Sequence, residues 1–236
     1  EDVLREECRW LNRRFFSGHT AQRPYIVLKW ARSADGFLDD HGRTVRISSP
    51  TTDVLVHRWR GQEQAILVGG RTVINDDPQL TVRLVDGRSP IRIIMDRRGL
   101  VPESARVFDD AAPSLLVTET EDGACPVGMI LNPECPTLEV AIELLLRKEI
   151  GFDIFMSQFD LPPVSSILVE GGATILSAFL ASGLWDEARV ITGAVSFGDG
   201  TRAPVMAGPA VRSMTSGSDR IDLFTNGPVP DSAWAW

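Results

Sequence analysis

The sequence predicts an α/β fold in which a central, mostly parallel β-sheet is flanked by helices. Two observations lead to this prediction. Short runs rich in valine, isoleucine and leucine recur along the chain, and such nearly continuous apolar strands are typical of parallel sheets that are buried on both faces. Segments with helical periodicity lie between these runs, and alternation of strands with helices is typical of layered α/β folds.

The individual elements follow from these patterns in chain order. Strands are predicted over 25–31, 65–69, 91–96, 114–118, 166–170 and 188–195. A helix is predicted after Ser49, which suits an N-cap before Pro50, and Gly61 suits its end. Further helices are predicted within 136–151 and 171–183, which end at Gly151 and Gly183.

Composition divides the chain into three parts. Residues 1–23 are charged and aromatic by turns, which predicts a short helix and a linker before Pro24. Residues 24–225 form the predicted α/β domain, and residues 226–236 are predicted to form a loose C-terminal tail. Because the chain begins at Glu1 without an initiating methionine, we expect it to be part of a longer protein.

Overall composition excludes several classes of protein. The 236 residues are 43% hydrophobic and 24% charged, which is typical of a globular chain and not of a disordered or collagen-like one. Lysine and arginine number 24 against 32 aspartates and glutamates, so a formal net charge of −8 disfavours nucleic-acid binding. Neither a signal peptide nor an apolar run near the ~20 residues of a membrane span is present. We therefore expect a cytoplasmic protein that binds neither membrane nor nucleic acid.

Metal-binding spacings are also absent from the sequence. The three cysteines form no C-x-x-C pair, and the three histidines show no H-E-x-x-H pattern. We therefore expect no zinc site.

Two strand ends carry paired glycines. Gly69-Gly70 follows one predicted strand, and Gly171-Gly172 follows another directly after Glu170. Neither segment has a Walker or G-x-G-x-x-G pattern, and each alone is also compatible with a plain turn. Small residues at such junctions let backbone N–H groups approach an anion, and the carboxyl ends of parallel strands share one edge of the sheet. Together the two junctions favour a nucleotide-binding crevice at that edge.

Several cationic residues are candidates for ligand binding. Lys29 lies in a predicted buried strand, where it needs an anionic partner or a route to solvent, and the residues alone leave both open. Arg60 and Arg83 are candidate phosphate ligands because a guanidinium offers paired donors to an oxyanion. Arg97 and Arg98 follow a strand where the extra phosphate of a nucleotide could bind. Solvated surface charge is the alternative for all four arginines.

The turn-rich segment ARSADGFLDDHG follows the strand of Lys29. Asp35-Gly36 allows a tight reversal there, and the segment is a candidate active-site loop. Asp-Gly turns are common, so this pattern is weakly specific.

In order and spacing, these motifs resemble the pyrimidine reductase of riboflavin biosynthesis, the C-terminal domain of the RibD family. The resemblance covers about residues 24–225, and it rests on RPYIVLKWARSADGFL, the VH-x-x-R helix, ILVGGRTVINDDPQLTVR, PIRIIMD and ILVEGGATILSAFLASGLWDE. It implies a dihydrofolate-reductase-like three-layer sandwich and a homodimer. The segment REECRWLNRRF resembles the junction to an N-terminal zinc deaminase in bifunctional members, whose H-x-E and P-C-x-x-C elements this chain lacks.

The resemblance also implies a reaction and a set of site residues. Members of the family reduce the ribosyl group of 5-amino-6-(5-phosphoribosylamino)uracil to its ribityl form with NADPH. The implied catalytic residues are Lys29, Asp76 and Glu170. The implied substrate-binding residues are Thr44, Ser48, Arg60, Leu80 (through its backbone) and Arg83. The implied cofactor-binding residues are Gly69, Thr72, Asp96, Gly171 and Gly172.

Two positions depart from the family pattern. Arg46 stands where the family usually has tryptophan, and Arg71 stands where a second small glycine is common. Both departures bear on how the cofactor stacks and how its diphosphate lies.

Two questions stay open at the level of sequence. Reduction of a C=N bond needs a proton, and Lys29, or Glu170 or Asp76 through a water molecule, could supply it. Another NADPH reductase of a pteridine-like or pyrimidine metabolite, or a non-catalytic ligand-binding member, would have a similar sequence. The presence of all three proposed catalytic residues favours an enzyme.

Overall fold

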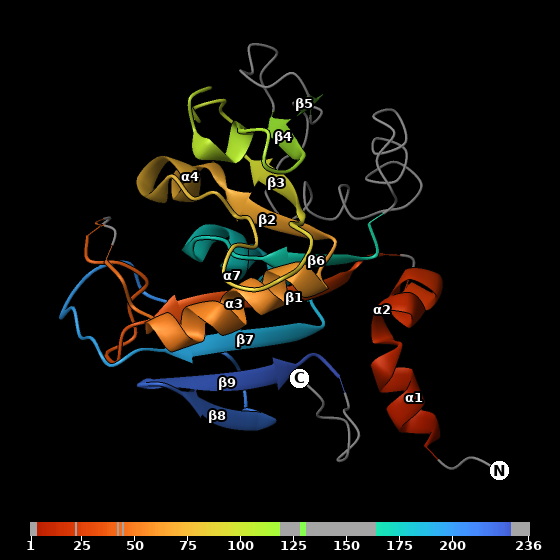
Figure 1. Cartoon of the computed structure of the whole chain (residues 1–236). Coiled ribbons are helices and arrows are strands. Elements are labelled where there is room, and N and C mark those ends of the chain that lie inside the picture. Colours follow the sequence, from red (N-terminus) through yellow and green to blue (C-terminus); the bar gives the residue numbers. More distant parts are fainter. Residues whose placement is uncertain are drawn as a thin grey trace.

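A nine-stranded sheet forms the centre of the part of the chain that the structure describes. In the computed structural model this part comprises residues 4–21, 23–41, 43, 45–118, 128–130 and 164–227, and the helix predicted within 136–151 lies outside it. The strand order is β5-β4-β3-β2-β6-β1-β7-β9-β8 (Figure 1). The strands are β1 (Tyr25–Arg32), β2 (Ala65–Gly69), β3 (Ile91–Met95), β4 (Ser114–Thr118), β5 (Gly128–Ile130), β6 (Ser166–Val169), β7 (Glu187–Thr192), β8 (Arg212–Ser216) and β9 (Asp219–Thr225).

The predicted parallel sheet is confirmed, and an antiparallel hairpin extends it. Every pairing from β5 across to β7 is parallel, whereas β9 pairs antiparallel with both β7 and β8. All six predicted strands are present. The β8–β9 hairpin was missed because β8 alternates exposed and partly buried residues, a pattern that a search for continuous apolar runs does not detect. Its two-residue turn contains Gly217 at φ +59°, a conformation that favours glycine.

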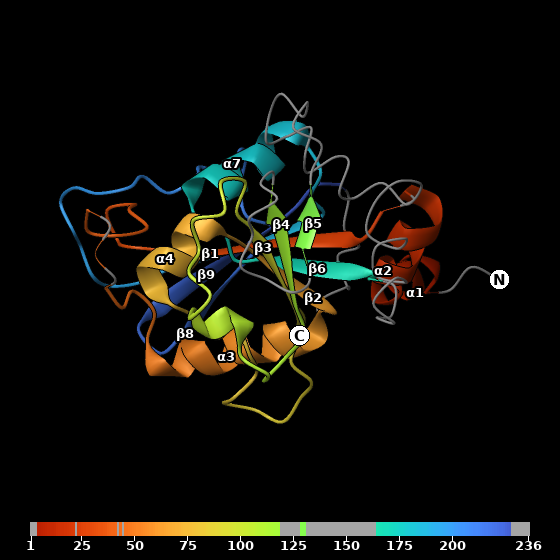
Figure 2. The same ribbon diagram turned by 90° about the horizontal axis from the view of Figure 1, so that it is seen from above.

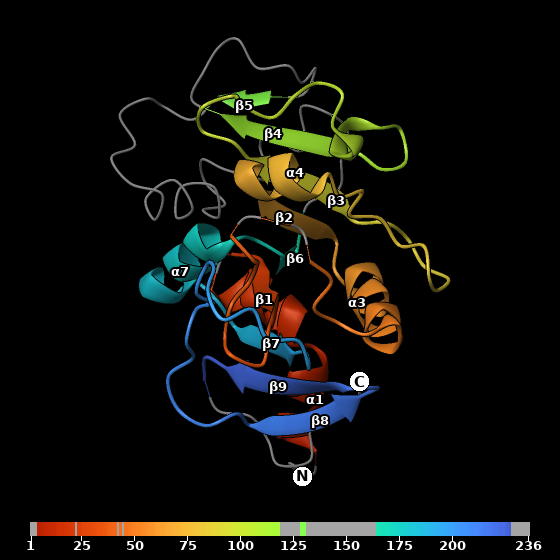
Figure 3. The same ribbon diagram turned by 90° about the vertical axis from the view of Figure 1, so that its left-hand side faces the viewer.

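Helices cover the two faces of the sheet. Helix α3 (Pro50–Gln62) lies on one face, and α7 (Ala173–Ser182) lies on the other (Figures 2 and 3). The predicted cap is confirmed, because the Ser49 hydroxyl accepts a hydrogen bond from the Thr52 amide at 3.4 Å. Gly183 ends α7 at φ +70°, as predicted, whereas α3 continues one residue beyond Gly61.

Helix α4 (Gly70–Asp76) was not predicted. It starts directly at the end of β2, where the sequence indicated only a glycine-rich junction. The helix is short and only Gly70 and Val73 are buried, so it leaves little apolar periodicity in the sequence.

Alternation along β1 determines which face each side chain meets. Ile26, Leu28 and Trp30 belong to the apolar core on the α7 face. Tyr25 and Val27 belong to the core on the α3 face. Lys29 is in step with Tyr25 and Val27, so its side chain lies on the same face as α3.

The N-terminal segment lies at the amino edge of the sheet (Figure 1). It consists of α1 (Arg5–Leu11), α2 (Arg13–Phe16) and a π-helical turn, η1 (Ser17–Ala21). The Arg14 guanidinium donates to the buried carboxylate of Glu63, with an Nε to Oε2 distance of 2.7 Å. Where the sequence predicted a helix and a linker, the segment is therefore helical and in contact with the domain.

Among the helices that the structure describes, none combines the length and the apolar character that crossing a bilayer requires.

Candidate active site

A cavity of about 900 Å³ opens at the carboxyl edge of the sheet. Its lining comes from the ends of the parallel strands β1, β2, β3 and β6, from α4 and the segment after it, and from the first residues of α7. One residue of α3 and the segment after β1 also contribute to the lining. The predicted site residues that line it are Lys29, Arg60, Gly69, Thr72, Asp76, Leu80, Asp96, Glu170, Gly171 and Gly172. The fold therefore brings residues from across the sequence to one space.

Three largely buried charged residues of the cavity form a cluster. The Glu170 carboxylate accepts two hydrogen bonds from Arg60, each at 2.9 Å, and one from Lys29 Nζ at 3.4 Å. The three side chains are only 9%, 12% and 13% exposed respectively. They come from the end of β6, from α3 and from β1, three elements that are adjacent in the fold.

The surrounding cations hold Glu170 in its ionised form. Burial alone raises the pKa of this carboxyl, but the charges and hydrogen bonds of Arg60 and Lys29 outweigh burial and lower it to about 2. Burial likewise lowers the pKa of Arg60, and Glu170 outweighs that effect and raises it. At neutral pH Glu170 therefore accepts hydrogen bonds and holds no proton to donate.

The segment after α4 forms one wall of the cavity. Leu80 is 2% exposed, lines the cavity and has a φ of +58°, a left-handed conformation that is uncommon for leucine. Arg60 Nη1 donates to the Thr81 carbonyl at 3.4 Å, and the Arg83 amide donates to His57 Nδ1 at 2.9 Å. These contacts fix the wall against α3.

Arg83 and Ser48 are not among the described residues that line the cavity. Arg83 is exposed, and its guanidinium donates to the Thr81 hydroxyl at 2.7 Å. The Ser48 hydroxyl donates to Asp53 in the first turn of α3 at 2.8 Å. Thr44, another predicted substrate-binding residue, lies outside the described residues.

Arg83 nevertheless lies in the field of other cations. Burial, followed by the positive charges of Arg60 and Arg106, lowers the pKa of Arg83. Guanidinium groups that repel one another in this way are stabilised by an anion between them.

Two glycine turns border the cavity where β2 and β6 end. A Cβ atom on Gly171 would lie 2.8 Å from the Ile175 side chain, and one on Gly172 would lie 3.2 Å from the Thr72 hydroxyl. Gly172 is the N-cap of α7, and no side chain caps this end. The first N–H groups of the helix, which have no intrahelical partner, therefore open toward the cavity.

Asp96 occupies a third position at this edge. Its carboxylate accepts a hydrogen bond from the Val101 amide at 2.7 Å. A Cβ atom on Gly70 would lie 2.9 Å from the Asp96 side chain, so only glycine fits there. Asp96 and the start of α4 are thus packed together.

The structure adds lining residues that the sequence did not single out. Asp39 and His41 come from the segment proposed as an active-site loop, and Arg43 lies just beyond it, but none of the three is among the predicted site residues. Arg97 and Arg98, the sequence candidates for binding an extra nucleotide phosphate, also line the cavity, and together with Arg71 they give it a basic side. The Asp35-Gly36 turn was the available signal for the loop, and nothing in the sequence showed which of its residues face inward.

A parallel sheet with glycine-opened turns and a charged cluster in one cavity at its carboxyl edge is typical of α/β proteins that bind a nucleotide and a small polar ligand. The chain belongs to the RibD C-terminal domain family, which matches residues 24–221.

Two curated relatives illustrate the match. The chain is 35% identical over 202 residues to the riboflavin biosynthesis protein RibD of Aquifex aeolicus, covering 84% of this chain and 54% of that protein. It is 30% identical over 222 residues to the 2,5-diamino-6-ribosylamino-4(3H)-pyrimidinone 5′-phosphate reductase of Methanothermobacter thermautotrophicus, covering 86% of this chain and 98% of that protein. The chain thus spans about half the length of the RibD relatives and nearly all of the archaeal reductase. A reductase of this family implies a nicotinamide cofactor.

A solved structure supports the same assignment. The deaminase/5-amino-6-(5-phosphoribosylamino)uracil reductase of Thermotoga maritima superposes with a TM-score of 0.79 at 30% identity, covering 94% of this chain and 62% of that one. The fold is therefore the dihydrofolate-reductase-like sandwich that the sequence resemblance implied.

Proposed function

We propose that this chain reduces the ribosyl group of 5-amino-6-(5-phosphoribosylamino)uracil to its ribityl form with NADPH. One observation carries the proposal. The cluster of Lys29, Glu170 and Arg60 lies in the same cavity as the glycine-opened start of α7. Charged groups for the substrate and N–H groups for a dinucleotide therefore border one space. The reactions named for the relatives support this choice.

The residues present fit a dinucleotide. The glycine turns leave space that a Cβ would fill at Gly171 and Gly172, and the uncapped start of α7 offers N–H groups to a diphosphate. The basic side formed by Arg71, Arg97 and Arg98 suits the extra phosphate that distinguishes NADPH from NADH. Thr72 and Asp96 complete the proposed cofactor-binding set.

The chemistry consists of adding a hydride and a proton across a C=N bond. When bound, the cofactor supplies the hydride to C1′ of the open-chain imine. The imine nitrogen takes a proton, and the product is the ribitylamine. The chain has to hold the substrate in place and deliver this proton.

We propose Lys29 as the proton donor. Glu170 is held as a carboxylate with a pKa of about 2, so it does not supply a proton at neutral pH. The Lys29 ammonium has three N–H donors and gives one of them to Glu170. Glu170 is then a residue that positions Lys29 and Arg60. Asp76, which is exposed at the end of α4, is proposed to contact the ribose chain.

The substrate phosphate is proposed to lie between Arg60 and Arg83. Burial and the positive charges of Arg60 and Arg106 lower the pKa of Arg83, and an anion beside its guanidinium would offset this repulsion. Because Arg60 is already bound to Glu170, the exposed Arg83 guanidinium has more freedom to turn toward a phosphate. The backbone of Leu80 and the side chains of Thr44 and Ser48 complete the proposed substrate set.

Oxidation of NADPH followed at 340 nm tests the proposal. We expect turnover with the phosphorylated uracil substrate, and much weaker turnover with its dephosphorylated form or with NADH. The same assay is repeated with the 2,5-diaminopyrimidinone phosphate, the substrate in the name of the archaeal relative. Faster turnover of the 2,5-diaminopyrimidinone phosphate would make that compound the substrate. Equal turnover of the phosphorylated and dephosphorylated forms would favour a reductase of another pteridine-like or pyrimidine metabolite. No oxidation of NADPH would favour a ligand-binding role.

We also propose that the protein is a homodimer, that it is located in the cytoplasm and that it is fused to a zinc deaminase in a longer protein. Sedimentation of the purified chain tests the first, since a monomeric mass at micromolar concentration would contradict it.

A further inference from the structure

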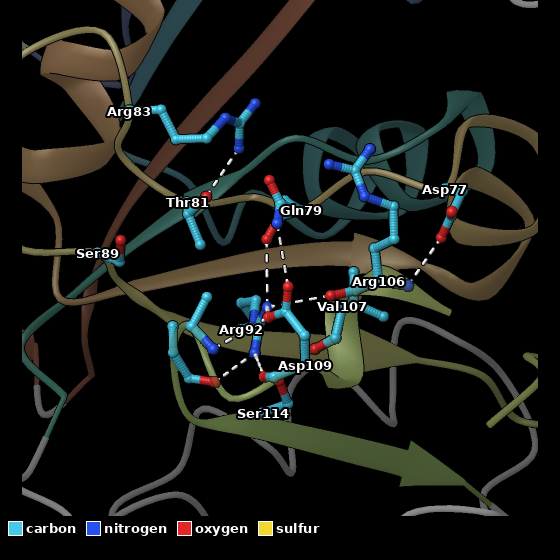
Figure 4. A network of polar contacts seen from close by, with 12 residues as sticks. Asp77, Gln79, Thr81, Arg83, Ser89, Arg92, Arg106, Val107, Asp109 and Ser114 are labelled. Atoms are coloured by element: carbon cyan, nitrogen blue, oxygen red, sulfur yellow. Dashed lines mark hydrogen bonds and ion pairs between the residues drawn. The ribbon is translucent and has the colours of Figure 1, made fainter. Parts of the chain in front are cut away.

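An arginine that lies behind the cavity wall is among the largest fully buried side chains in the described part of the molecule. Arg92, in β3, is 0% exposed. A buried guanidinium destabilises the fold unless its donors are satisfied. Arg92 Nη1 donates to the Asp109 carboxylate at 2.7 Å and to the Arg106 carbonyl at 3.3 Å, and Nη2 donates to the carbonyls of Asp109 and Ala112 (Figure 4).

The acceptors include the segment that forms the cavity wall. Arg92 Nη1 also donates to the Gln79 carbonyl at 3.4 Å, and Gln79 Nε2 donates to Asp109 Oδ2 at 3.0 Å. The Asp77 carboxylate accepts a hydrogen bond from the Arg106 amide, the first residue of the 3-10 turn η2 (Arg106–Phe108), at 2.8 Å. The segment after α4 is therefore bound to the loop between β3 and β4 at two points.

These bonds lie next to a strained part of the backbone. Asp77 and Leu80 both have positive φ, at +39° and +58°. Such conformations cost of order 1 kcal/mol each and persist only where the surroundings enforce them. Gln79, held through both its backbone and its side chain, lies between them. On its other side, the wall is held to α3 through Thr81 and Arg83.

We propose that Arg92 is a positioning residue that sets the cavity wall at Leu80 without contacting a ligand. It is not among the described residues that line the cavity. It acts through Gln79 on the backbone of Leu80, and so on the relative positions of Thr81, Arg60 and Arg83. This inference rests on the proposed function, because the wall is where the phosphate end of the substrate is proposed to bind. The glycine turns proposed for the cofactor take no part in the hydrogen bonds of Arg92 and Gln79 described above.

Three variants and a matched control test the proposal. Arg92→Met removes all hydrogen bonds of the guanidinium. Asp109→Ala removes the carboxylate that accepts from Arg92 and Gln79, and Gln79→Ala removes the side-chain hydrogen bond from Gln79 to Asp109. Ser114→Ala is the control, because the Ser114 hydroxyl donates to the Val107 carbonyl in the same loop without contacting the wall. Should Arg92→Met fail to fold, the other two variants decide, since Asp109 and Gln79 are partly exposed.

The first readout needs no substrate. In hydrogen-exchange measurements on the ligand-free protein, amides of residues 79–83 are expected to exchange at least about tenfold faster in Asp109→Ala and Gln79→Ala than in wild type. Ser114→Ala is expected to leave them unchanged. Equal exchange in Gln79→Ala, Asp109→Ala and the control would overturn the proposal, whether or not the chain is a reductase.

The second readout separates positioning from general loss of structure. The KM for the phosphorylated substrate is expected to rise about tenfold in the variants, because small misplacements of binding groups weaken binding strongly. kcat and the KM for NADPH are expected to stay within about twofold. Parallel loss of kcat and of both KM values, or an unchanged substrate KM, would overturn the positioning role. Lack of NADPH oxidation in wild type would refute the proposed function alone and leave the exchange result standing.

Discussion

The two edges of the sheet hold similar ion clusters in opposite surroundings. At the carboxyl edge, Glu170 lies between Lys29 and Arg60 and borders the cavity. At the amino edge, Glu187 at the start of β7 accepts a hydrogen bond from Arg189 Nε at 2.6 Å, and both side chains are less than 5% exposed. In each cluster burial raises the pKa of the carboxyl, and the neighbouring cations outweigh burial and lower it.

The difference between the clusters is access. Arg13 of the N-terminal segment lies 3.6 Å from Glu187, and Glu187 is not among the described residues that line the cavity. Buried ion pairs add little net stability over an apolar replacement, so neither cluster is explained by stability alone. Ionised residues in a buried cluster therefore mark a candidate site only where the cluster faces a space that a ligand can enter.

The largest effect is expected from Lys29→Ala at the open edge. We expect turnover to fall roughly 10²–10⁴-fold, the range typical of losing a general acid. The dissociation constant for NADPH is expected to stay within about twofold, because Lys29 is not part of the proposed cofactor-binding set. Steady-state kinetics and cofactor titration measure both, and normal turnover would remove Lys29 from the mechanism.

The corresponding change at the closed edge is Arg189→Met. It leaves the buried Glu187 carboxylate with a 3.4 Å hydrogen bond from the Tyr25 hydroxyl and the peripheral Arg13, without its closest cation. We therefore expect the free energy of unfolding to fall by roughly 3–5 kcal/mol. kcat and KM at 25 °C are expected to match wild type. Urea unfolding and kinetics on one preparation test this, and a selective loss of activity would contradict the distinction between the edges.

A third prediction concerns pH. A carboxyl whose pKa is lower in the folded than in the unfolded chain stabilises the fold fully above its unfolded pKa, and the contribution is lost as pH falls through the folded pKa. For Glu170 the pH range over which this stabilisation is lost runs from the ordinary pKa of 4.5 down to the folded pKa of about 2. We expect the stability advantage of wild type over Glu170→Gln to shrink by about 2–3 kcal/mol between pH 5 and pH 2. A constant difference, measured by urea unfolding at several pH values, would contradict the cation-stabilised carboxylate.

The smallest effect is expected from Arg13→Met. Its side chain is 19% exposed, and its single contact with Glu187 is long, so we expect a loss of at most about 1 kcal/mol. Its stacking over Trp10 and Tyr25 contributes within the same range. Thermal unfolding of the variant beside Arg189→Met gives the comparison. A loss as large as that of Arg189→Met would mean that the N-terminal segment is essential to the closed cluster.

Sequence reasoning succeeded where local chemistry decides. Continuous apolar runs located β1, β2, β3 and β6, and the Ser49 cap located the start of α3, because these signals depend on neighbouring residues only. The two glycine junctions were correctly expected at one edge, since parallel strands align their ends. The short α4 and the half-exposed β8–β9 hairpin carry too little apolar periodicity for this reasoning.

Pairing between charged residues that are distant in the sequence could not be predicted in the same way. Arg60 was considered as a phosphate ligand, and its bidentate contact with Glu170, 110 positions away in the sequence, was not foreseen. The sequence predicts Arg92 only as part of a strand, and Arg14 only as part of the short helix and linker before Pro24. A charged residue shows in the sequence that it needs a partner, but the partner depends on which strands become neighbours.

The strand order also has a consequence for biosynthesis. Both neighbours of β1 in the sheet, β6 and β7, come from beyond residue 165. A nascent chain emerging from the ribosome therefore carries an apolar first strand that stays without its sheet partners until some 140 more residues have been made. Such long-range closure is entropically slow. Because β1, the strand that carries Lys29, lies inside the sheet, we expect folding during translation to depend on chaperones.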